Sequence, residues 1–265
     1  MDGLGVLLKG RGTKGRLESC LIRATKLAGV QVSEGAESIV VASIIHGVHG
    51  TGLLFSGKET KGRLEECDVW DNSASGVQIG EGADPIIASN LIRDGPGAGV
   101  IITGVGTKGR LEGCVVSGHD LAGVQIDGGA DPLLRACFIR DGLYDGVRIT
   151  GVDTKGTLVR NHVIGNAKHG LSVKSGAAPV ITHNIFYANE AAGVAFGDVG
   201  TRGRLSCNSI SGGKRFGLFV TAEAAPIVEG NLIYANAQVG VVQRASLILG
   251  FPVLSGGTHR IFLGE

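Results

Sequence analysis

A short sequence that recurs at a fixed interval constrains this chain more than any other feature. Thr13–Cys20 reads TKGRLESC, and a related segment begins every 47 residues after it. The later copies are Thr60–Cys67 (TKGRLEEC), Thr107–Cys114 (TKGRLEGC), Thr154–Asn161 (TKGTLVRN) and Thr201–Asn208 (TRGRLSCN). A period this strict, without a single insertion or deletion, is typical of a protein built from stacked repeats.

A glycine followed by an apolar–x–apolar triplet divides each 47-residue unit in two. These glycines alternate at 23 and 24 residues: Gly5, Gly29, Gly52, Gly76, Gly99, Gly123, Gly146, Gly170, Gly193, Gly217 and Gly240. We expect this glycine at a bend, where its backbone freedom is needed. At about 3.3 Å per residue, the interval accommodates three short strands and three bends. A repeat of paired helices needs about 33 residues, so the interval predicts one turn of a parallel β-helix.

Three columns of apolar residues appear when the chain is aligned at this interval. Every member of each column is apolar. The columns run from Leu17 to Val228, from Ile22 to Ile233 and from Val30 to Val241. Equivalent side chains of successive coils would stack at about 4.8 Å, so each column would form an inward-facing ladder. We therefore predict an all-β parallel β-helix, a solenoid of about 10–11 coils with three parallel sheets, over residues 1–243, with a C-terminal cap over residues 244–265.

A fourth column is small and polar or soft. Its members are Cys20, Ser43, Cys67, Asn90, Cys114, Cys137, Asn161, Asn184, Asn208 and Asn231. We expect asparagine here to adopt left-handed geometry at a bend and to form an amide ladder from coil to coil. Cysteine would be a small buried substitute, and a disulfide between Cys114 and Cys137 stays open as an alternative. Cysteines in a packing role, with no Asn-x-Ser/Thr site, favour a cytoplasmic or nuclear protein.

The charge balance argues against several kinds of partner. The 25 basic and 24 acidic residues give a net charge of +1, which creates no global attraction to nucleic acid or to an anionic membrane. No segment is apolar enough to span a membrane. The seven histidines show no metal-ligand spacing, and no phosphate-binding loop or catalytic triad stands out. We therefore expect no cofactor, no metal, no membrane and no nucleic-acid partner.

One outward column, just before the central glycine, mixes arginine with aromatic residues. The members that we select as an interaction face are Trp70, Arg93, Arg140, Tyr187 and Tyr234. Arginine and large aromatic side chains are enriched where proteins bind other proteins. The alternative is that the sequences RDG and WDN at these positions are solvated bends.

Three aspartates that follow this column form an alternative, acidic site: Asp71, Asp94 and Asp141. Asp71 and Asp94 would lie on adjacent coils, where two carboxylates could bind Ca²⁺ or share a proton, as in β-helical polysaccharide enzymes. Ca²⁺ takes six or more oxygen ligands, however, and the next coil has Gly118 at this position. We therefore favour the interpretation that these aspartates are turn residues.

Two segments carry a resemblance to a known family: Gly82–Gly104 (GADPIIASNLIRDGPGAGVIITG) and Gly109–Pro132 (GRLEGCVVSGHDLAGVQIDGGADP). They resemble right-handed β-helix repeats of the carbohydrate-binding and sugar-hydrolase type. Within that type they are most similar to the β-helix domain of F-box substrate receptors of SCF ubiquitin ligases. The resemblance covers nearly all of Gly5–Val242 and implies a right-handed coil. The matching residues are structural, so it predicts fold better than function.

From this resemblance and the uniform columns we expect a non-catalytic protein-interaction scaffold, similar to a ubiquitin-ligase receptor, whose partner is another protein. The alternative is a carbohydrate-active enzyme or glycan-binding module, of lyase, hydrolase or epimerase type, that binds polysaccharide with the acidic residues. The Gly-His-Gly segment of polygalacturonases and the Asp-Pro-His segment of alginate epimerases are lacking, so no catalytic residue is carried over. No F-box precedes the repeats, which already begin at Gly5, and we expect a longer natural protein.

Overall fold

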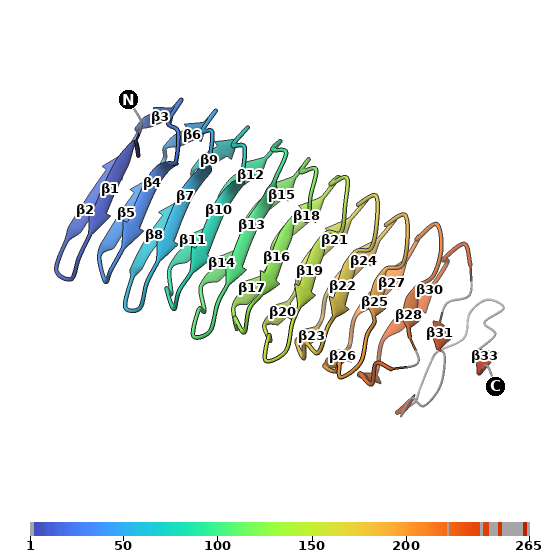
Figure 1. The fold of residues 1–265 in the computed structure, drawn as a ribbon. Coiled ribbons are helices and arrows are strands. Elements are labelled where there is room, and N and C mark those ends of the chain that lie inside the picture. Colours follow the sequence, from blue (N-terminus) through green and yellow to red (C-terminus); the bar gives the residue numbers. More distant parts are fainter. Residues whose placement is uncertain (1–2, 222, 239–240, 244–248, 251–261, 264–265) are drawn as a thin grey trace.

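The computed structural model describes residues 3–221, 223–238, 241–243, 249–250 and 262–263, and no described residue is helical. Short strands follow one another around a stack of coils, with β1 (Val6–Lys9) and β30 (Leu232–Tyr234) at opposite ends of the stack (Figure 1). Every third strand belongs to the same sheet, and all pairings are parallel. The predicted all-β parallel solenoid with three sheets is therefore confirmed.

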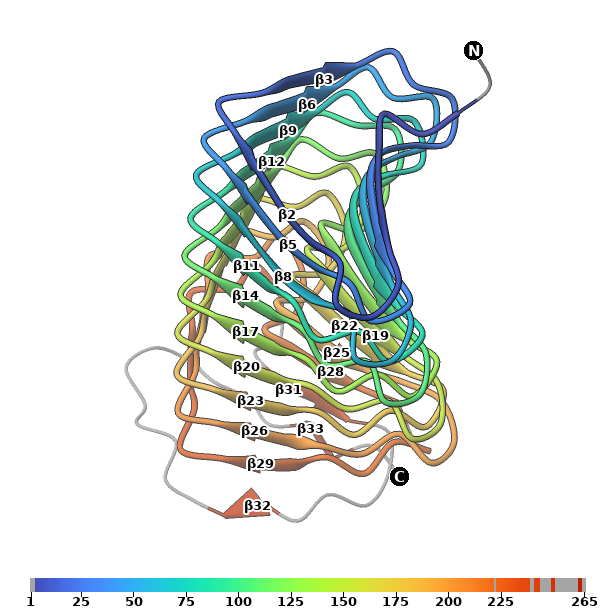
Figure 2. The same cartoon turned by 90° about the vertical axis from the view of Figure 1, so that its left-hand side faces the viewer.

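Sheet A contains the longest strands. They are β1, β4 (Ala28–Ser33), β7 (Thr51–Ser56), β10 (Ser75–Gly80), β13 (Ala98–Thr103), β16 (Val124–Asp127), β19 (Val147–Thr150), β22 (Leu171–Lys174), β25 (Val194–Phe196), β28 (Leu218–Val220), β31 (Val241–Gln243) and β33 (Phe262–Leu263). Figure 2, which shows the coils from one end, presents sheet A as the indented side of the stack.

Sheets B and C form the other two sides. The strands of sheet B are β2 (Lys14–Glu18), β5 (Glu37–Val41), β8 (Lys61–Glu65), β11 (Ile86–Ala88), β14 (Arg110–Glu112), β17 (Leu133–Arg135), β20 (Thr157–Val159), β23 (Val180–Thr182), β26 (Arg204–Ser206), β29 (Ile227–Glu229) and β32 (Leu249–Gly250). Those of sheet C are β3 (Leu21–Arg23), β6 (Ile44–His46), β9 (Asp68–Trp70), β12 (Leu91–Arg93), β15 (Val115–Ser117), β18 (Phe138–Arg140), β21 (His162–Ile164), β24 (Ile185–Tyr187), β27 (Ser209–Ser211) and β30.

The strand register reproduces the three apolar columns. Leu64 pairs with Ile87 in sheet B, and Ile92 pairs with Val116 in sheet C. All four side chains are buried in one continuous core. A fourth apolar column, which the alignment missed, lies two residues after the third and includes Phe55. Sheet A therefore contributes two inward-facing ladders to the core, because its strands are longer.

The small polar column forms the expected ladder of hydrogen bonds between coils. The backbone N–H of Asn161 donates to Oδ1 of Asn184 at 2.9 Å, and the Asn184 side chain donates to the carbonyl of Leu158 at 2.9 Å. The left-handed residue is the one before the asparagine, however: His183 has φ 56°. The expectation of left-handed asparagines was therefore wrong. Cys114 and Cys137 are free thiols, so the structure shows no disulfide between them.

The central glycine is needed for close packing and not for a bend. A Cβ atom at Gly99 would lie 2.5 Å from Cγ1 of Val116 and 2.6 Å from the carbonyl oxygen of Gly123. The φ of Gly99 is outside the left-handed region. Glycine recurs because the apolar ladder of sheet C packs directly against the start of each sheet A strand.

An alternating bend between sheets A and B explains the 47-residue period. From Phe55 to Leu64 the chain takes nine steps, but from Ile79 to Ile87 it takes eight. In the longer bend, Oγ1 of Thr60 accepts a hydrogen bond from Gly35 of the preceding coil at 2.9 Å. The recurring TKG threonine therefore joins each long bend to the short bend before it.

The predicted C-terminal cap at residues 244–265 lies almost wholly outside the described residues. Of that segment, only β32 and β33 are described, and they pair with β29 and β31. The division into residues 1–243 and 244–265 therefore stays a prediction. The described residues include no helix long and apolar enough to cross a membrane.

Candidate functional site

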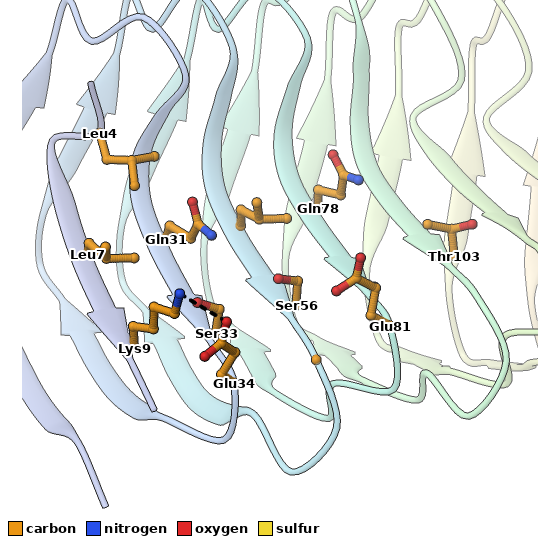
Figure 3. Close-up of a pocket in the computed structure, with 13 residues that line it drawn as sticks. Leu4, Leu7, Lys9, Gln31, Ser33, Glu34, Ser56, Gln78, Glu81 and Thr103 are labelled. Carbon is orange, nitrogen blue, oxygen red and sulfur yellow. Dashed lines mark ion pairs between the residues drawn. The ribbon is translucent and has the colours of Figure 1, made fainter. Parts of the chain in front are cut away.

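The outer face of sheet A carries a groove along the first coils. It has a volume of ≈570 Å³ and runs across β1, β4, β7, β10 and β13 (Figure 3). Because side chains alternate across a strand, the residues between the two core ladders line it. Gln31 and Gln78 lie on its floor. Ser33, Ser56 and Thr103 form a second row beside them, nearer the ends of their strands.

The groove is lined by polar and apolar side chains, and it carries two carboxylates, Glu34 and Glu81, against one cation. Its amides and hydroxyls both donate and accept hydrogen bonds, which suits a ligand rich in hydroxyl groups. The one cation in its lining, Lys9, pairs with Glu34 at 3.1 Å, with both side chains largely exposed. With two carboxylates against one cation, the groove itself does not attract a negatively charged chain, but its amides and hydroxyls can bind hydroxyl groups.

The same face becomes cationic in the later coils. The outward column of the groove floor continues through Gln125 to Arg148 and then Ser172, which are paired in register. Lys174 ends β22 on the same face as Ser172. Arg148 and Lys174 are both half-buried. Arg148 and Lys174 therefore form a cationic cluster on this face, which follows the carboxylate of Asp127 at the end of β16.

A buried carboxyl and an imidazole lie at the edge of this cationic region. Asp145 is 5% exposed, and its Oδ1 accepts a hydrogen bond from the backbone N–H of His169 at 3.1 Å. Burial raises the pKa of Asp145 above its ordinary value, although Lys174 and Arg148 act in the opposite direction. Burial also lowers the pKa of His169, against the effect of Asp145. Both shifts favour the neutral forms of the two side chains.

The hydrogen bonds of His169 fix which ring nitrogen carries the proton. Its Nδ1 accepts a hydrogen bond from the backbone N–H of Ala192 at 3.1 Å. In the neutral ring the proton therefore lies on Nε2, which leaves Nε2 as a donor. In this arrangement His169 can donate to a ligand oxygen, but it offers no free nitrogen to accept a proton.

The sequence interpretation missed Asp145 and His169, although a signal was present. They belong to the column that directly precedes the central glycine. Its earlier members are small: Ala28, Thr51, Ser75, Ala98 and Ala122. Thr51 and Ser75 already form a polar pair there, with their hydroxyl oxygens 3.2 Å apart. An acid and a histidine in consecutive coils of a small-residue column could have been found by aligning this column too.

The predicted interaction face lies on the outside of sheet C. The ring of Trp70 stacks on His46, with centroids 4.2 Å apart, and the guanidinium of Arg93 lies 5.3 Å from the Trp70 centroid. Arg93 itself is held by Asp68 at 2.9 Å. Neighbouring side chains therefore already contact both Trp70 and Arg93.

The remaining members of that face stand further along sheet C. Arg140 forms an ion pair with the adjacent Asp141. Tyr187 is 50% exposed and Tyr234 is 40% exposed. Hydrogen bonds from Ser211 and Ser209 lower the pKa of Tyr234. The structure places these residues in one outward column, and whether they bind anything stays a prediction.

The three aspartates of the alternative acidic site lie at the bends after sheet C. Asp71, Asp94 and Asp141 have φ values of 51°, 51° and 56°. Left-handed geometry of this kind is tolerated by aspartate, which suits a turn. Asp94 and Asp141 are each paired with the arginine before them. Among the described residues, no three Asp, Glu, His or Cys side chains gather as a metal site requires.

Comparison with known families identifies the type of repeat. The family model described as "Right handed beta helix region" matches residues 1–139 and 97–233. The chain belongs to this family. The expected right-handed β-helix repeat is thereby confirmed, whereas the finer resemblance to F-box receptors is not shown.

Solved structures of right-handed β-helix proteins share the fold at low sequence identity. The periplasmic alginate epimerase AlgG is 18% identical, with a TM-score of 0.65 over 91% of this chain and 61% of AlgG. The A-module of mannuronan C-5 epimerase AlgE6 from Azotobacter vinelandii is 17% identical, with a TM-score of 0.63 over 88% of this chain and 71% of the module. An alginate lyase from Paenibacillus sp. is 12% identical, with a TM-score of 0.58 over 82% of this chain and 91% of the lyase.

The chain thus spans less than two thirds of AlgG. No curated protein sequence matches it. The comparisons overturn two expectations. The first is the non-catalytic, ubiquitin-ligase-like scaffold, because the similar β-helix structures are alginate epimerases and an alginate lyase. The second is the cytoplasmic or nuclear location, because AlgG is a periplasmic protein. Cysteine usage was a weak guide, since a ladder position accepts a free thiol wherever the protein works.

Proposed function

We propose that this right-handed β-helix is a carbohydrate-active protein that holds an acidic polysaccharide along the outer face of sheet A. The observation that carries the proposal is the change in polarity along that face. A groove with Gln31 and Gln78 on its floor continues along the same columns, past Asp127, to half-buried Arg148 and Lys174. A polymer laid parallel to the stack would meet hydrogen-bonding groups first and cations next.

The physical chemistry of the stack suits an extended ligand. Coils separated by about 4.8 Å repeat the same outward positions many times along one line, so weak contacts can add up over several sugar units. Concave faces of solenoids are extended binding surfaces for the same reason. A uronate polymer carries hydroxyl groups and one carboxylate per unit, which match the hydrogen-bonding and cationic parts of this face.

The comparisons support the substrate class. AlgG and the AlgE6 A-module are epimerases of alginate and mannuronan, and the Paenibacillus protein is an alginate lyase. Their coils resemble those of this chain over most of its length, at identities that establish only the fold. Alginate and mannuronan are uronate polymers, so they are the first ligands to test. The proposal is therefore that the protein binds uronate polymers. The same experiment also asks whether it converts them.

Isothermal titration calorimetry with alginate, polygalacturonate and neutral dextran tests this function. We expect the acidic polymers to bind and dextran to bind much more weakly. Added salt should weaken the acidic complexes, because it screens exposed charges. Proton NMR of the recovered polymer would show whether it is cleaved or epimerised. If neither acidic polymer binds at low salt, the proposed function is wrong.

A further inference from the structure

We propose that Arg148, Ser172 and Lys174 form a subsite for the carboxylate of one uronate unit, an inference that rests on the proposed function. The subsite occupies β19 and β22, beyond the groove. It assigns the charge recognition of the polymer to one position of the stack. The rest of the face then supplies hydrogen bonds to hydroxyl groups.

The backbone register brings the three residues together. Arg148 and Ser172 are direct partners on adjacent parallel strands, which lie about 4.8 Å apart. Their neighbours in sequence, Ile149 and Val173, are buried in the core, so Arg148 and Ser172 point to the outer face. Lys174 follows Ser172 by two residues and shares its face. An arginine and a lysine therefore flank one serine on the outside of sheet A.

Neither cation is neutralised by the protein. Within residues 3–221 and 223–238, no carboxylate forms an ion pair with Arg148 or Lys174, whereas Arg93, Arg140 and Arg63 on the other two faces are all paired. Asp127, on the neighbouring strand β16, accepts hydrogen bonds from Thr103 and Gln125. Asp145 is buried and bonded to the backbone of His169. Burial raises its pKa, which weakens it as a counter-ion.

Ser172 provides an independent sign of a missing ligand. Its side chain is fully buried, and its Oγ has no hydrogen-bond partner. Buried hydroxyl groups in native proteins almost always have a partner, so an orphan calls for an explanation. A carboxylate held by Arg148 and Lys174 would place an acceptor beside this hydroxyl.

Calorimetry with a mannuronate oligosaccharide, and with the same oligosaccharide after its carboxyl groups are reduced to alcohols, tests the subsite. We expect Arg148→Gln and Lys174→Gln each to weaken binding of the uronate form by about tenfold, the scale of one charged hydrogen bond. The reduced oligosaccharide should bind wild type weakly and the two variants no worse. Lys108→Gln is the matched control, because it removes the same charge from an exposed position beside sheet B.

Ser172→Ala separates a ligand contact from a structural role. Because Oγ has no partner within the protein, we expect the melting temperature to stay the same or rise. The affinity for the uronate form should nevertheless fall several-fold. A lower melting temperature with unchanged affinity would show that the serine is structural and would count against the subsite.

The remaining outcomes distinguish the two proposals. If wild type binds the uronate form and Arg148→Gln and Lys174→Gln bind it equally well, the subsite is overturned and the proposed function stands. Equal binding of uronate and reduced forms by wild type also overturns the subsite. If wild type binds neither form nor the polymers, the proposed function and the subsite both fail.

Discussion

At the scale of single residues, the coil is limited by contacts between one turn and the next. The central glycine shows this most clearly, since at Gly99 a single methyl group would meet Val116 and the carbonyl of Gly123 at once. Gly80, the last residue of β10, has its nearest such atom at 3.6 Å and is outside the left-handed region. Two glycines of the same sheet therefore have very different tolerance for a side chain.

Gly99→Ala should destabilise the fold by about 1–3 kcal/mol or more, because the neighbouring backbone must shift to admit the methyl group. Gly80→Ala should change the free energy of unfolding by less than about 0.5 kcal/mol. Urea denaturation of both variants measures the difference. Equal midpoints would mean that the close approach at Gly99 is not a real constraint.

His119 predicts a pH dependence of stability. It occupies a second ladder, formed by Asn72, Asn166 and Asn189, and its Nδ1 has no partner. Burial lowers its pKa below the ordinary 6.5, although hydrogen bonding to the backbone of Ile92 and Gly95 and, less strongly, the charges of Asp94 and Asp120 oppose this. Below pH 6.5 the unfolded chain therefore binds a proton that the folded chain does not, and stability falls as the pH falls.

His119→Asn should remove this contribution and fit the ladder better. We expect the unfolding free energy of the variant to fall less steeply than that of wild type as the pH drops below 6.5, where His119 of the unfolded chain takes up its proton. Above that pH the variant should be at least as stable as wild type. Denaturation at a series of pH values gives both curves, and parallel curves would contradict the assignment.

At the scale of elements, the unit of this fold is a pair of coils. The long bend and the short bend alternate, and the threonine of the long bend ties them together. Oγ1 of Thr107 accepts a hydrogen bond from Gly82 of the preceding coil at 2.8 Å and donates to the carbonyl of Thr103 at 2.8 Å. Thr107 is fully buried. The 47-residue period is therefore a hydrogen-bonding period.

Thr107→Val keeps the shape of the side chain but removes both hydrogen bonds. We expect a loss of about 1–3 kcal/mol in the free energy of unfolding, because the partly buried amide of Gly82 and carbonyl of Thr103 lose their partner. Thr13→Val is the control, since the structure shows for Thr13 only the bond to the carbonyl of Lys9. Thermal denaturation should separate the two, and equal losses would rule out a tie between coils.

Some features of these elements could be predicted from the sequence and others could not, for physical reasons. The apolar columns were predictable because one buried ladder imposes one residue type, as Leu64 and Ile87 show. The reason for the central glycine could not be predicted, because it depends on how closely sheet C approaches sheet A. The candidate site was missed because the sequence does not show that Arg148 and Lys174 lie on the indented face of sheet A. The curvature of sheet A comes from packing, and no single residue encodes it.

At the scale of the whole molecule, three long faces compete to be the binding surface. Sheet A is indented (Figure 2), and it carries Arg148 and Lys174, for which the described residues provide no ion pair. Sheet C is covered by side chains that already pair or stack with one another, as Trp70 does with His46. Sheet B presents Arg63 paired with Glu65. Sheet A differs from the other two faces in being indented, and its cations Arg148 and Lys174 lie in that hollow.

Hydroxyl-radical labelling with and without alginate should locate the polymer on the whole stack. We expect binding to protect Leu54 and Phe219, which lie on the outer face of sheet A, because a bound polymer excludes water from them. Labelling of Trp70 and Tyr187 on sheet C should not change. Mass spectrometry of the digested protein reads each site separately, and dextran at the same concentration controls for viscosity.

The same measurement decides between the two faces that the sequence and the structure favour. Asp71, Asp94 and Asp141 lie at the edge of sheet C, so a polymer bound through them would cover Tyr187 or Trp70 before any residue of sheet A. Protection confined to sheet C would therefore revive the acidic site and remove sheet A as the binding face. Protection along sheet A that ends near Phe219 would place the polymer across β19 and β22, because those strands separate the two protected regions.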